Sequence, residues 1–184
     1  SDVYKRQLQD NEPYVRSEAV RALGEIGDNK SVTQLRLALN DKDSWVRERA
    51  AYALGKMKAT EAKDDLLKAL KDVDPNVIAG AARALGEIKV QEAAELLVNL
   101  LNHTNARVRR DASYALGGLK AANAVEALII ALEDNDSKVR AEAVRALSEI
   151  GDPRAIEPLE KLKQDNDPWV RSQAEWALRN IRGQ

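Results

Sequence analysis

Histidine, cysteine and clustered carboxylate side chains are the groups that could perform catalysis or bind a metal ion. The chain has a single histidine, His103, and no cysteine, which excludes disulfide bonds, thiolate metal sites and cysteine nucleophiles. His103 lies in a predicted turn near Asn105, without the further histidines that a histidine-based metal site needs. The sequence also lacks a glycine-rich phosphate loop, a nucleophile elbow and a paired-carboxylate pocket. We therefore predict that the protein is not an enzyme and uses no cofactor or metal.

Arginine and aspartate recur at a fixed interval instead. Each of five arginines follows a valine, and the valines are spaced by 31 residues or by a multiple of 31, with Val77-Ile78 as the altered copy. Aspartate recurs on the same period, and His103 is the exception. If each arginine reaches the turn of the next repeat, the pairs are Arg16 with Asp41, Arg47 with Asp72, Arg109 with Asp134, and Arg140 with Asp165.

The pairing of each arginine with the aspartate of the next repeat is a hypothesis. It is supported because Ile78, which replaces the arginine, would then correspond to His103, which replaces the aspartate. The pairs could bind an anion, but we favour a structural clamp between repeats. The planar guanidinium suits that role, because it holds a carboxylate in a fixed geometry. The junction between the third and fourth repeats lacks this pair, and Gly80 lies in the first helix of the third repeat. We therefore expect this junction to be the least stable of the array.

The elements that carry these residues follow from the 31-residue period, which predicts an all-α, right-handed α-solenoid of stacked antiparallel helix pairs. In the first helix of a repeat, Val15, Ala19, Ala22, Leu23 and Ile26 have helical spacing and predict a buried stripe. An acidic or amide residue on the same period predicts each N-cap, from Glu12-Pro13 to Asp167-Pro168. The second helix carries leucine at a constant position, as at Leu35 and Leu66.

We expect a single domain over residues 1–184. Residues 1–9 would form part of a second helix, and residue 165 onward a terminal first helix that caps the array. The five repeats between them are 10–40, 41–71, 72–102, 103–133 and 134–164. Glu175 replaces a small or apolar residue of the earlier repeats, as expected where no neighbour packs behind the helix.

Composition limits the partners. The 29 basic and 30 acidic residues nearly cancel, which argues against binding to nucleic acid or an anionic membrane. No apolar run reaches the length of a membrane span. We predict a cytoplasmic monomer that binds neither nucleic acid nor membrane. The uninterrupted spacing suits an engineered protein, whereas the irregular Lys58, Ile78, His103 and Lys120 suit a natural one, and Ser1–Gln7 resembles the tail of a fragmentary open reading frame from sequencing reads.

The repeated phrase of Val-Arg, Ala, Ala-Leu-Gly and Ile-Gly-Asp, best seen in residues 10–28 and 134–152, resembles the short HEAT-like repeat of the phycobilisome-lyase type. The resemblance covers essentially the whole chain. It implies that first helices line the concave side of the solenoid and second helices the convex side, and that the function is protein binding. It also implies a second possibility, because some members of the family are chromophore lyases, and artificial binder libraries use the same repeat.

Six of the seven aromatic residues fall on first-helix positions outside the core stripe, and arginines share these positions. Aromatic and arginine side chains dominate protein-binding hot spots, because they bury a large area at little entropic cost. The alternative that Trp45 and Trp169 only cover the helix start stays open. We predict a partner-binding concave face made of Tyr14, Arg21, Trp45, Arg49, Tyr52, Arg83, Arg107, Tyr114, Arg145, Trp169 and Trp176.

Two functions remain as hypotheses. The leading one is a non-catalytic interaction module or scaffold that binds a protein or peptide on this face. The alternative, which rests on the resemblance alone, is an accessory subunit or chaperone of a bilin lyase or a related tetrapyrrole-handling enzyme.

Overall fold

The computed structural model describes the backbone of residues 2–183 and the side chains from Val3 onward. Within this range the chain forms α-helices, short 3-10 turns and no β-strand, so the predicted all-α repeat fold is confirmed. The structure divides into two compact units, residues 1–88 and 89–184, and each is described by itself. The single domain expected over 1–184 therefore stays a prediction. No helix among the described residues is long and apolar enough to cross a membrane.

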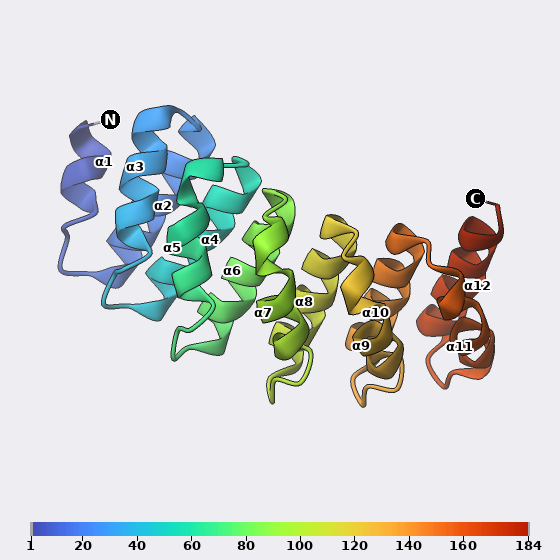
Figure 1. The fold of residues 1–184 in the computed structure, drawn as a ribbon. Helices are drawn as coiled ribbons and strands as arrows, with labels where there is room; N and C mark the ends of the chain where they lie inside the picture. The colour runs from blue at the N-terminus through green and yellow to red at the C-terminus, as the bar shows by residue number, and fades with distance from the viewer. Residues whose placement is uncertain (1, 184) are drawn as a thin grey trace. The chain divides into compact units, whose positions relative to one another are not determined.

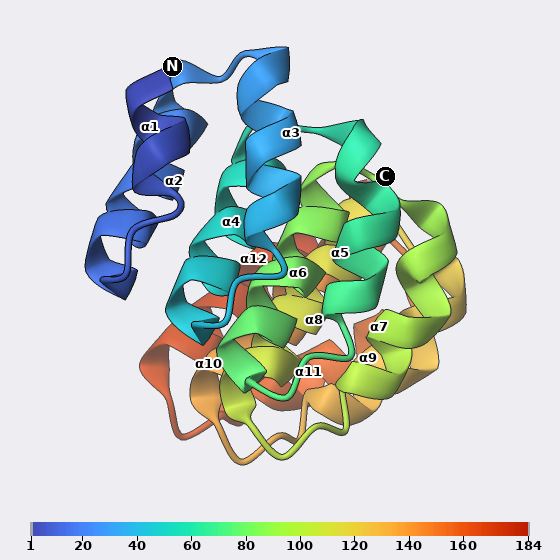
Figure 2. The same ribbon diagram turned by 90° about the vertical axis from the view of Figure 1, so that its left-hand side faces the viewer.

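Unit 1 contains three first helices, which pack side by side in chain order. The second helices form a parallel row, as Figures 1 and 2 show from two directions. The first helices are α2 (Pro13–Ile26), α4 (Ser44–Lys56) and α6 (Pro75–Glu87), and the second row consists of α1 (Asp2–Gln7), α3 (Asn29–Ala38) and α5 (Lys63–Ala69), with a 3-10 turn at Thr60–Ala62.

Unit 2 repeats this arrangement with α8 packed on α10 and α10 packed on α12. Short 3-10 turns lie at Gln91–Ala93, Ala122–Ala124, Pro153–Ala155 and Leu162–Gln164. The first helices are α8 (Ala106–Leu119), α10 (Ser137–Ile150) and α12 (Pro168–Arg182), and the second helices are α7 (Ala94–Leu100), α9 (Val125–Ala131) and α11 (Ile156–Lys161).

Each first helix begins at the residue that the periodic caps predicted. The side chains of Asp43, Asp74, Asn105, Asp136 and Asp167 accept hydrogen bonds from backbone N–H groups of the first turn, which would otherwise be unsatisfied. Glu12 occupies the same position without a side-chain hydrogen bond, but Pro13 pre-sets the helical φ and has no N–H to satisfy. The chain therefore restarts a helix at the same point of every repeat.

Five of the six described first helices end near a residue in the left-handed conformation. Gly27 and Gly151 take φ of 69° and 77°, a conformation that glycine adopts without steric penalty. Lys58, Lys89 and Lys120 take the same conformation with φ of 54°, 61° and 51°. A residue with a Cβ atom is strained in this conformation, so these helix ends are less favourable than those at glycine.

The core follows the predicted stripe in the later repeats, except that its last position is half-buried at Met57 and Ile150, and the stripe is least buried in the first repeat. Ala19 and Leu23 are buried, but Val15 and Ala22 are only half-buried, and Ile26 is exposed. The expectation of a fully buried stripe in α2 was therefore wrong at its edge. The reason is positional, because no described residue occupies the place beside α2 that α2 occupies beside α4. Glu175 lies on α12, the final helix of the first-helix row, and it is exposed, as expected.

Candidate functional site

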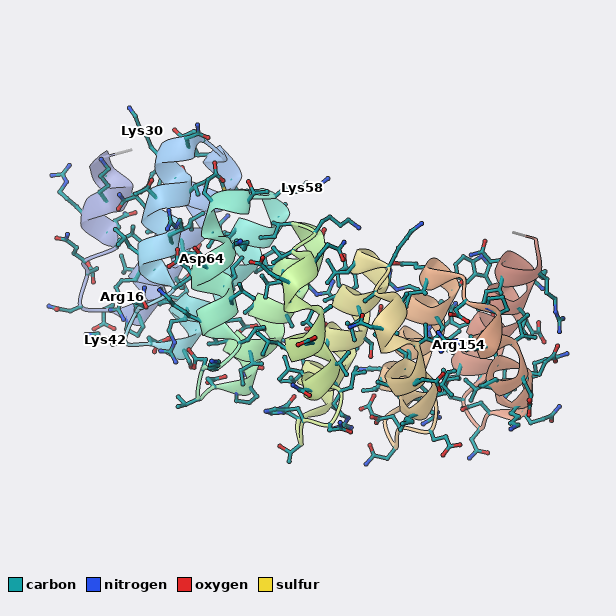
Figure 3. All side chains as sticks on the ribbon, viewed as in Figure 1. Arg16, Lys30, Lys42, Lys58, Asp64 and Arg154 are labelled. Atoms are coloured by element: carbon teal, nitrogen blue, oxygen red, sulfur yellow. The ribbon has the colours of Figure 1, made fainter. Side chains whose placement is uncertain are left out.

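On four of the first helices, α2, α4, α8 and α10, an arginine joins the turn before its helix to the turn of the next repeat. Arg16 donates from Nε and Nη2 to the two carboxylate oxygens of Asp41 at 2.8 and 2.9 Å. Its Nη1 donates to the carbonyl oxygens of Asp10 and Asn11 at 2.8 and 3.0 Å. Figure 3 shows Arg16 and Lys42 at one end of the unit 1 helices, and Lys30 and Lys58 at the opposite end. One guanidinium thus bridges two consecutive turns.

The same geometry recurs in both units, and it joins the four pairs that the sequence analysis proposed. The two hydrogen bonds between guanidinium and carboxylate are 2.8 and 2.9 Å for Arg47 with Asp72, 2.7 and 2.9 Å for Arg109 with Asp134, and 2.8 and 2.8 Å for Arg140 with Asp165. The aspartates also accept from the backbone of their own turn, as Asp41 does from the N–H of Asp43 at 2.9 Å.

These contacts favour a clamp over an anion site. The Asp41 carbonyl accepts from Arg47 Nη1 at 2.9 Å, so consecutive clamps are connected through one residue. Burial acts to raise the pKa of Asp41, but the hydrogen bonds from Arg16 and the Asp43 N–H outweigh it and hold that pKa below its ordinary value. Because protein acceptors already occupy these donors, a free anion would have to displace a buried carboxylate.

His103 takes the position that aspartate has in the other turns. Its Nδ1 accepts from the Asn105 N–H at 3.0 Å, as Asp41 accepts from Asp43, and its carbonyl accepts from Arg109 Nη1 at 2.9 Å. The histidine therefore serves as a turn residue in unit 2. Among the described residues no group of three or more His, Asp or Glu side chains is placed to hold a metal ion. Ile78 lies in unit 1 and His103 in unit 2, so the correspondence between these two exceptions to the repeat stays a prediction.

The predicted binding residues of unit 1 include a preformed aromatic cluster on α2 and α4. The rings of Tyr14 and Trp45 have centroids 6.1 Å apart, and the Arg49 guanidinium lies 4.6 Å from the centroid of the Trp45 ring. Glu18 accepts from Arg49 at 2.9 Å and from Arg21 at 2.9 Å, which fixes both arginines. A cation over a tryptophan face is attracted by the ring quadrupole, so the cluster is held before any partner arrives.

A hollow of about 280 Å³ lies beside this cluster. Its floor is narrow because α2 and α4 approach closely at Gly24, where a Cβ atom would lie 2.9 Å from the Cβ of Ala53. Tyr52, which is 59% exposed, forms one wall. The rim carries Arg21, Glu25, Arg49 and Lys56. An apolar floor with a charged rim suits one apolar side chain of a partner together with its polar neighbours.

Arg83 is half-buried on α6 of the same unit and has an interaction partner of its own. It is therefore a less accessible member of the predicted face than Tyr52.

In unit 2 the corresponding residues also contact one another. The Arg145 guanidinium lies 4.7 Å from the centroid of the Tyr114 ring. Arg145 also donates to Glu142 at 2.6 Å and to Glu149 at 3.0 Å, and Tyr114 is only half-buried. Trp169 and Trp176 on α12 are both exposed. Unit 2 thus offers two free indole rings at one edge.

Asp111 lies next to the predicted binding residue Arg107 on α8, but it is buried, with 2% of its surface exposed. Arg110 donates to its carboxylate at 3.3 Å, and the Nε of Arg107 lies 3.8 Å from it. Arg107 is thus partly engaged at its own helix, which reduces its availability to a partner. The available signal was the arginine four residues before Asp111, the spacing of neighbours on a helix.

A family profile described as HEAT repeats matches residues 2–72, 64–128 and 97–179, which together span nearly the whole chain. The chain belongs to the HEAT-repeat family. The predicted resemblance is therefore confirmed at the level of the family. A search of curated proteins finds no match.

Several solved structures resemble the chain over nearly its full length. An engineered protein is 27% identical with a TM-score of 0.72, and the match covers 100% of both chains. A chain from the complex of CpcE and CpcF of phycocyanin lyase from Nostoc sp. PCC7120 is 26% identical with a TM-score of 0.63, covering 98% of this chain and 81% of that one. A designed armadillo repeat protein in complex with the peptide (KR)4 is 21% identical with a TM-score of 0.69, covering 98% and 100%, and shows the fold alone.

Proposed function

We propose that this HEAT-repeat chain is a non-catalytic scaffold that binds a protein or peptide on the concave face that its first helices are predicted to form. The Tyr14, Trp45 and Arg49 cluster carries the proposal, since it combines exposed rings, a fixed cation and the adjoining hollow. Such preorganisation favours binding, because little side-chain entropy remains to be lost. The similarity to a chain from the complex of CpcE and CpcF supports an interaction role.

The remaining predicted residues extend this surface within each unit. In unit 1 the arginines Arg21 and Arg49 are held by Glu18, which leaves the aromatic rings as the main apolar contact area. In unit 2, Trp169 and Trp176 provide that area. Charges of both signs lie next to the rings, so the partner we expect is an amphipathic peptide and not a polyanion.

Selection of peptides from a random display library on the wild-type protein provides the probe. For the selected peptides, Trp45→Ala and Tyr52→Ala should each weaken binding about tenfold, as expected for hot-spot residues. Leu37→Ala and Ile130→Ala are matched controls, because both side chains are exposed and apolar but lie on second helices. Equal losses in the controls, or unchanged affinity in both test variants, would refute the assignment of the face.

The similarity to a chain of the phycocyanin lyase complex favours one alternative, an accessory role in bilin attachment or handling. A bilin added to the protein would then change its absorbance spectrum, and the Trp45→Ala and Tyr52→Ala variants would weaken that change. An unchanged spectrum at micromolar protein and bilin would leave the scaffold as the only supported function.

A further inference from the structure

The hollow between α2 and α4 differs in charge from the equivalent place in unit 2, which lies between α8 and α10 three repeats later. The position of Arg49 is held there by Glu142, and the position of Lys56 by Glu149. Two cations of the hollow thus correspond to two anions, although both pairs of helices pack directly against each other. The same repeat scaffold presents opposite charges at these positions in its two units.

In unit 2 a carboxylate of the chain itself lies against the glycine between the two helices. A Cβ atom on Gly117 would lie 3.0 Å from the Cβ of Ala146 and 3.2 Å from Oε2 of Glu149. Arg145 donates to Glu149 at 3.0 Å and also lies over the ring of Tyr114, which holds the acidic side chain in place. An ion pair within α10 therefore occupies the place that is hollow in unit 1.

In unit 1 the corresponding glycine stays open. A Cβ atom on Gly24 would lie 2.9 Å from the Cβ of Ala53, and Ala53 is the only residue of α4 within 4 Å of that point. Lys56 is exposed and does not reach it. Tyr52, one turn before Lys56, puts an uncharged ring at the position of Arg145. The hollow exists because α4 carries tyrosine and lysine where α10 carries its arginine–glutamate pair.

The cations at the rim of the hollow differ in how well they are neutralised. Arg21 donates to Glu18 at 2.9 Å and to Glu25 at 2.6 Å, and Arg49 donates to Glu18 at 2.9 Å. These two arginines and two glutamates balance in charge. Among the residues that the structure describes, Lys56 has no ion-pair partner. The rim therefore carries one cation without a counter-charge, which favours a partner that brings a carboxylate.

The volume of the hollow limits what enters beside this cation. Sites for a complete small-molecule ligand have about 300–1,000 Å³, whereas this hollow has about 280 Å³ and an apolar floor. Tyr52 adds an exposed ring, against which an aliphatic or aromatic side chain packs well. These dimensions suit one bulky apolar side chain of a peptide, and Lys56 then selects the charge of the residue next to it.

We propose that the hollow binds a linear segment of a partner protein in which an aspartate or glutamate adjoins a leucine or an aromatic residue. The apolar side chain fills the hollow against Tyr52, and the carboxylate pairs with Lys56. The partner thereby supplies to unit 1 the kind of group that Glu149 supplies to unit 2. This inference rests on the proposed scaffold function and narrows its partner to an acidic segment.

Parallel selections from one random peptide display library test the charge of the segment. Peptides selected on the wild type should be enriched in aspartate or glutamate next to leucine or an aromatic residue, and on Lys56→Glu this acidic enrichment should disappear. The variant should fold, because Glu25 and Glu149 already occupy this register. Lys68→Glu is the matched control, since Lys68 is also exposed but lies on the second helix α5, and the enrichment should remain.

A synthetic peptide with the most enriched sequence gives the affinities. On the wild type, replacing its acidic residue by the corresponding amide should weaken binding about threefold to fivefold, as expected for one exposed ion pair. Lys56→Glu should weaken binding of the acidic peptide about tenfold, because repulsion adds to the lost attraction. On Lys56→Gln the acidic and amide peptides should bind equally, and Tyr52→Ala should weaken both.

Failure of this inference differs from failure of the scaffold function. Peptides that need Trp45 and Tyr52 but show no acidic enrichment, or an amide peptide that binds the wild type as tightly as the acidic one, would overturn the inference alone. Peptides that neither Trp45→Ala nor Tyr52→Ala affects, or a library that yields no binder, would overturn both. A dimer of the unmodified chain that Tyr52→Ala abolishes would show that a second copy fills the hollow, which also contradicts the inference.

Discussion

Two buried glycines of the first helices in unit 1 should respond to alanine in opposite directions. Gly55 lies in α4 and Gly80 in α6, and both are buried. A Cβ atom at Gly80 would lie 3.5 Å from the Ala51 Cβ and from the Glu48 carbonyl oxygen, which is ordinary contact. A Cβ atom at Gly55 would lie 2.7 Å from the Ala84 Cα, so one backbone must move away from the other.

The magnitudes follow from two terms. Alanine in place of helical glycine gains about 0.5–1 kcal/mol at both positions through backbone entropy. At Gly55 the overlap costs about 1–3 kcal/mol, because a close-packed contact between helices cannot absorb a methyl group. We therefore expect Gly80→Ala to stabilise by about 0.5–1 kcal/mol and Gly55→Ala to destabilise by about 1–2 kcal/mol.

Thermal unfolding followed by circular dichroism measures both variants against the wild type. For a chain of this size, 1 kcal/mol corresponds to about 2–4 °C, so the melting temperatures of the two variants should differ by about 5 °C or more. If Gly55→Ala melts at or above the temperature of Gly80→Ala, the close backbone contact at Ala84 is not what fixes glycine at this register.

Three further predictions concern the turns. Arg47→Ala should cost about 2–3 kcal/mol in urea unfolding, with Arg47→Lys recovering less than half, because lysine cannot make the two parallel hydrogen bonds to Asp72. Arg21→Ala should cost much less, because its ion pairs are exposed, and equal costs for the two variants would contradict a clamp. Burial acts to raise the pKa of Asp72, but the hydrogen bonds from Arg47 and the Asp74 N–H lower it overall, so its stabilisation is present above the unfolded value near pH 4 and is lost as the pH falls through the lower folded value. An Asp72→Asn variant should accordingly show a shallower loss of melting temperature below about pH 4, and an unchanged acid profile would count against this assignment. Lys58→Gly should raise the melting temperature by about 2 °C, because φ of 54° strains a residue with a Cβ, whereas Gly27→Ala should lower it, and the same sign for both would contradict the strain.

The repeat and its caps could be predicted from the sequence because they depend on local, periodic information. A cap such as Asp43 acts on the backbone N–H groups of the next few residues, so its spacing from the helix is visible in the chain itself. The pairing of Arg47 with Asp72 could also be predicted from the sequence. The exact period places an arginine and an aspartate 25 residues apart in most repeats, and the two exceptions, Ile78 and His103, are themselves 25 residues apart, which indicated that each arginine binds the aspartate of the next repeat.

The surface was harder to predict, because exposure depends on neighbours. Asp111 and Glu142 occupy the same register, but only Asp111 is fully buried. Arg145 stacks on Tyr114, while Tyr52 remains exposed beside a hollow, although both tyrosines share one position in the repeat. Spacing cannot distinguish such pairs, since it carries no information about which rotamer a neighbouring side chain adopts.

By itself the sequence determined the α-helical repeat, its period and the residues that start each helix, because these follow from short-range hydrogen bonding and from apolar periodicity along the chain. Only the tertiary structure decided that Ile26 is exposed while Ile88 is buried, and that Trp45 lies between Tyr14 and Arg49. The physical reason is that burial and contact belong to pairs of helices, and identical repeats acquire different surfaces from the neighbours that pack against them.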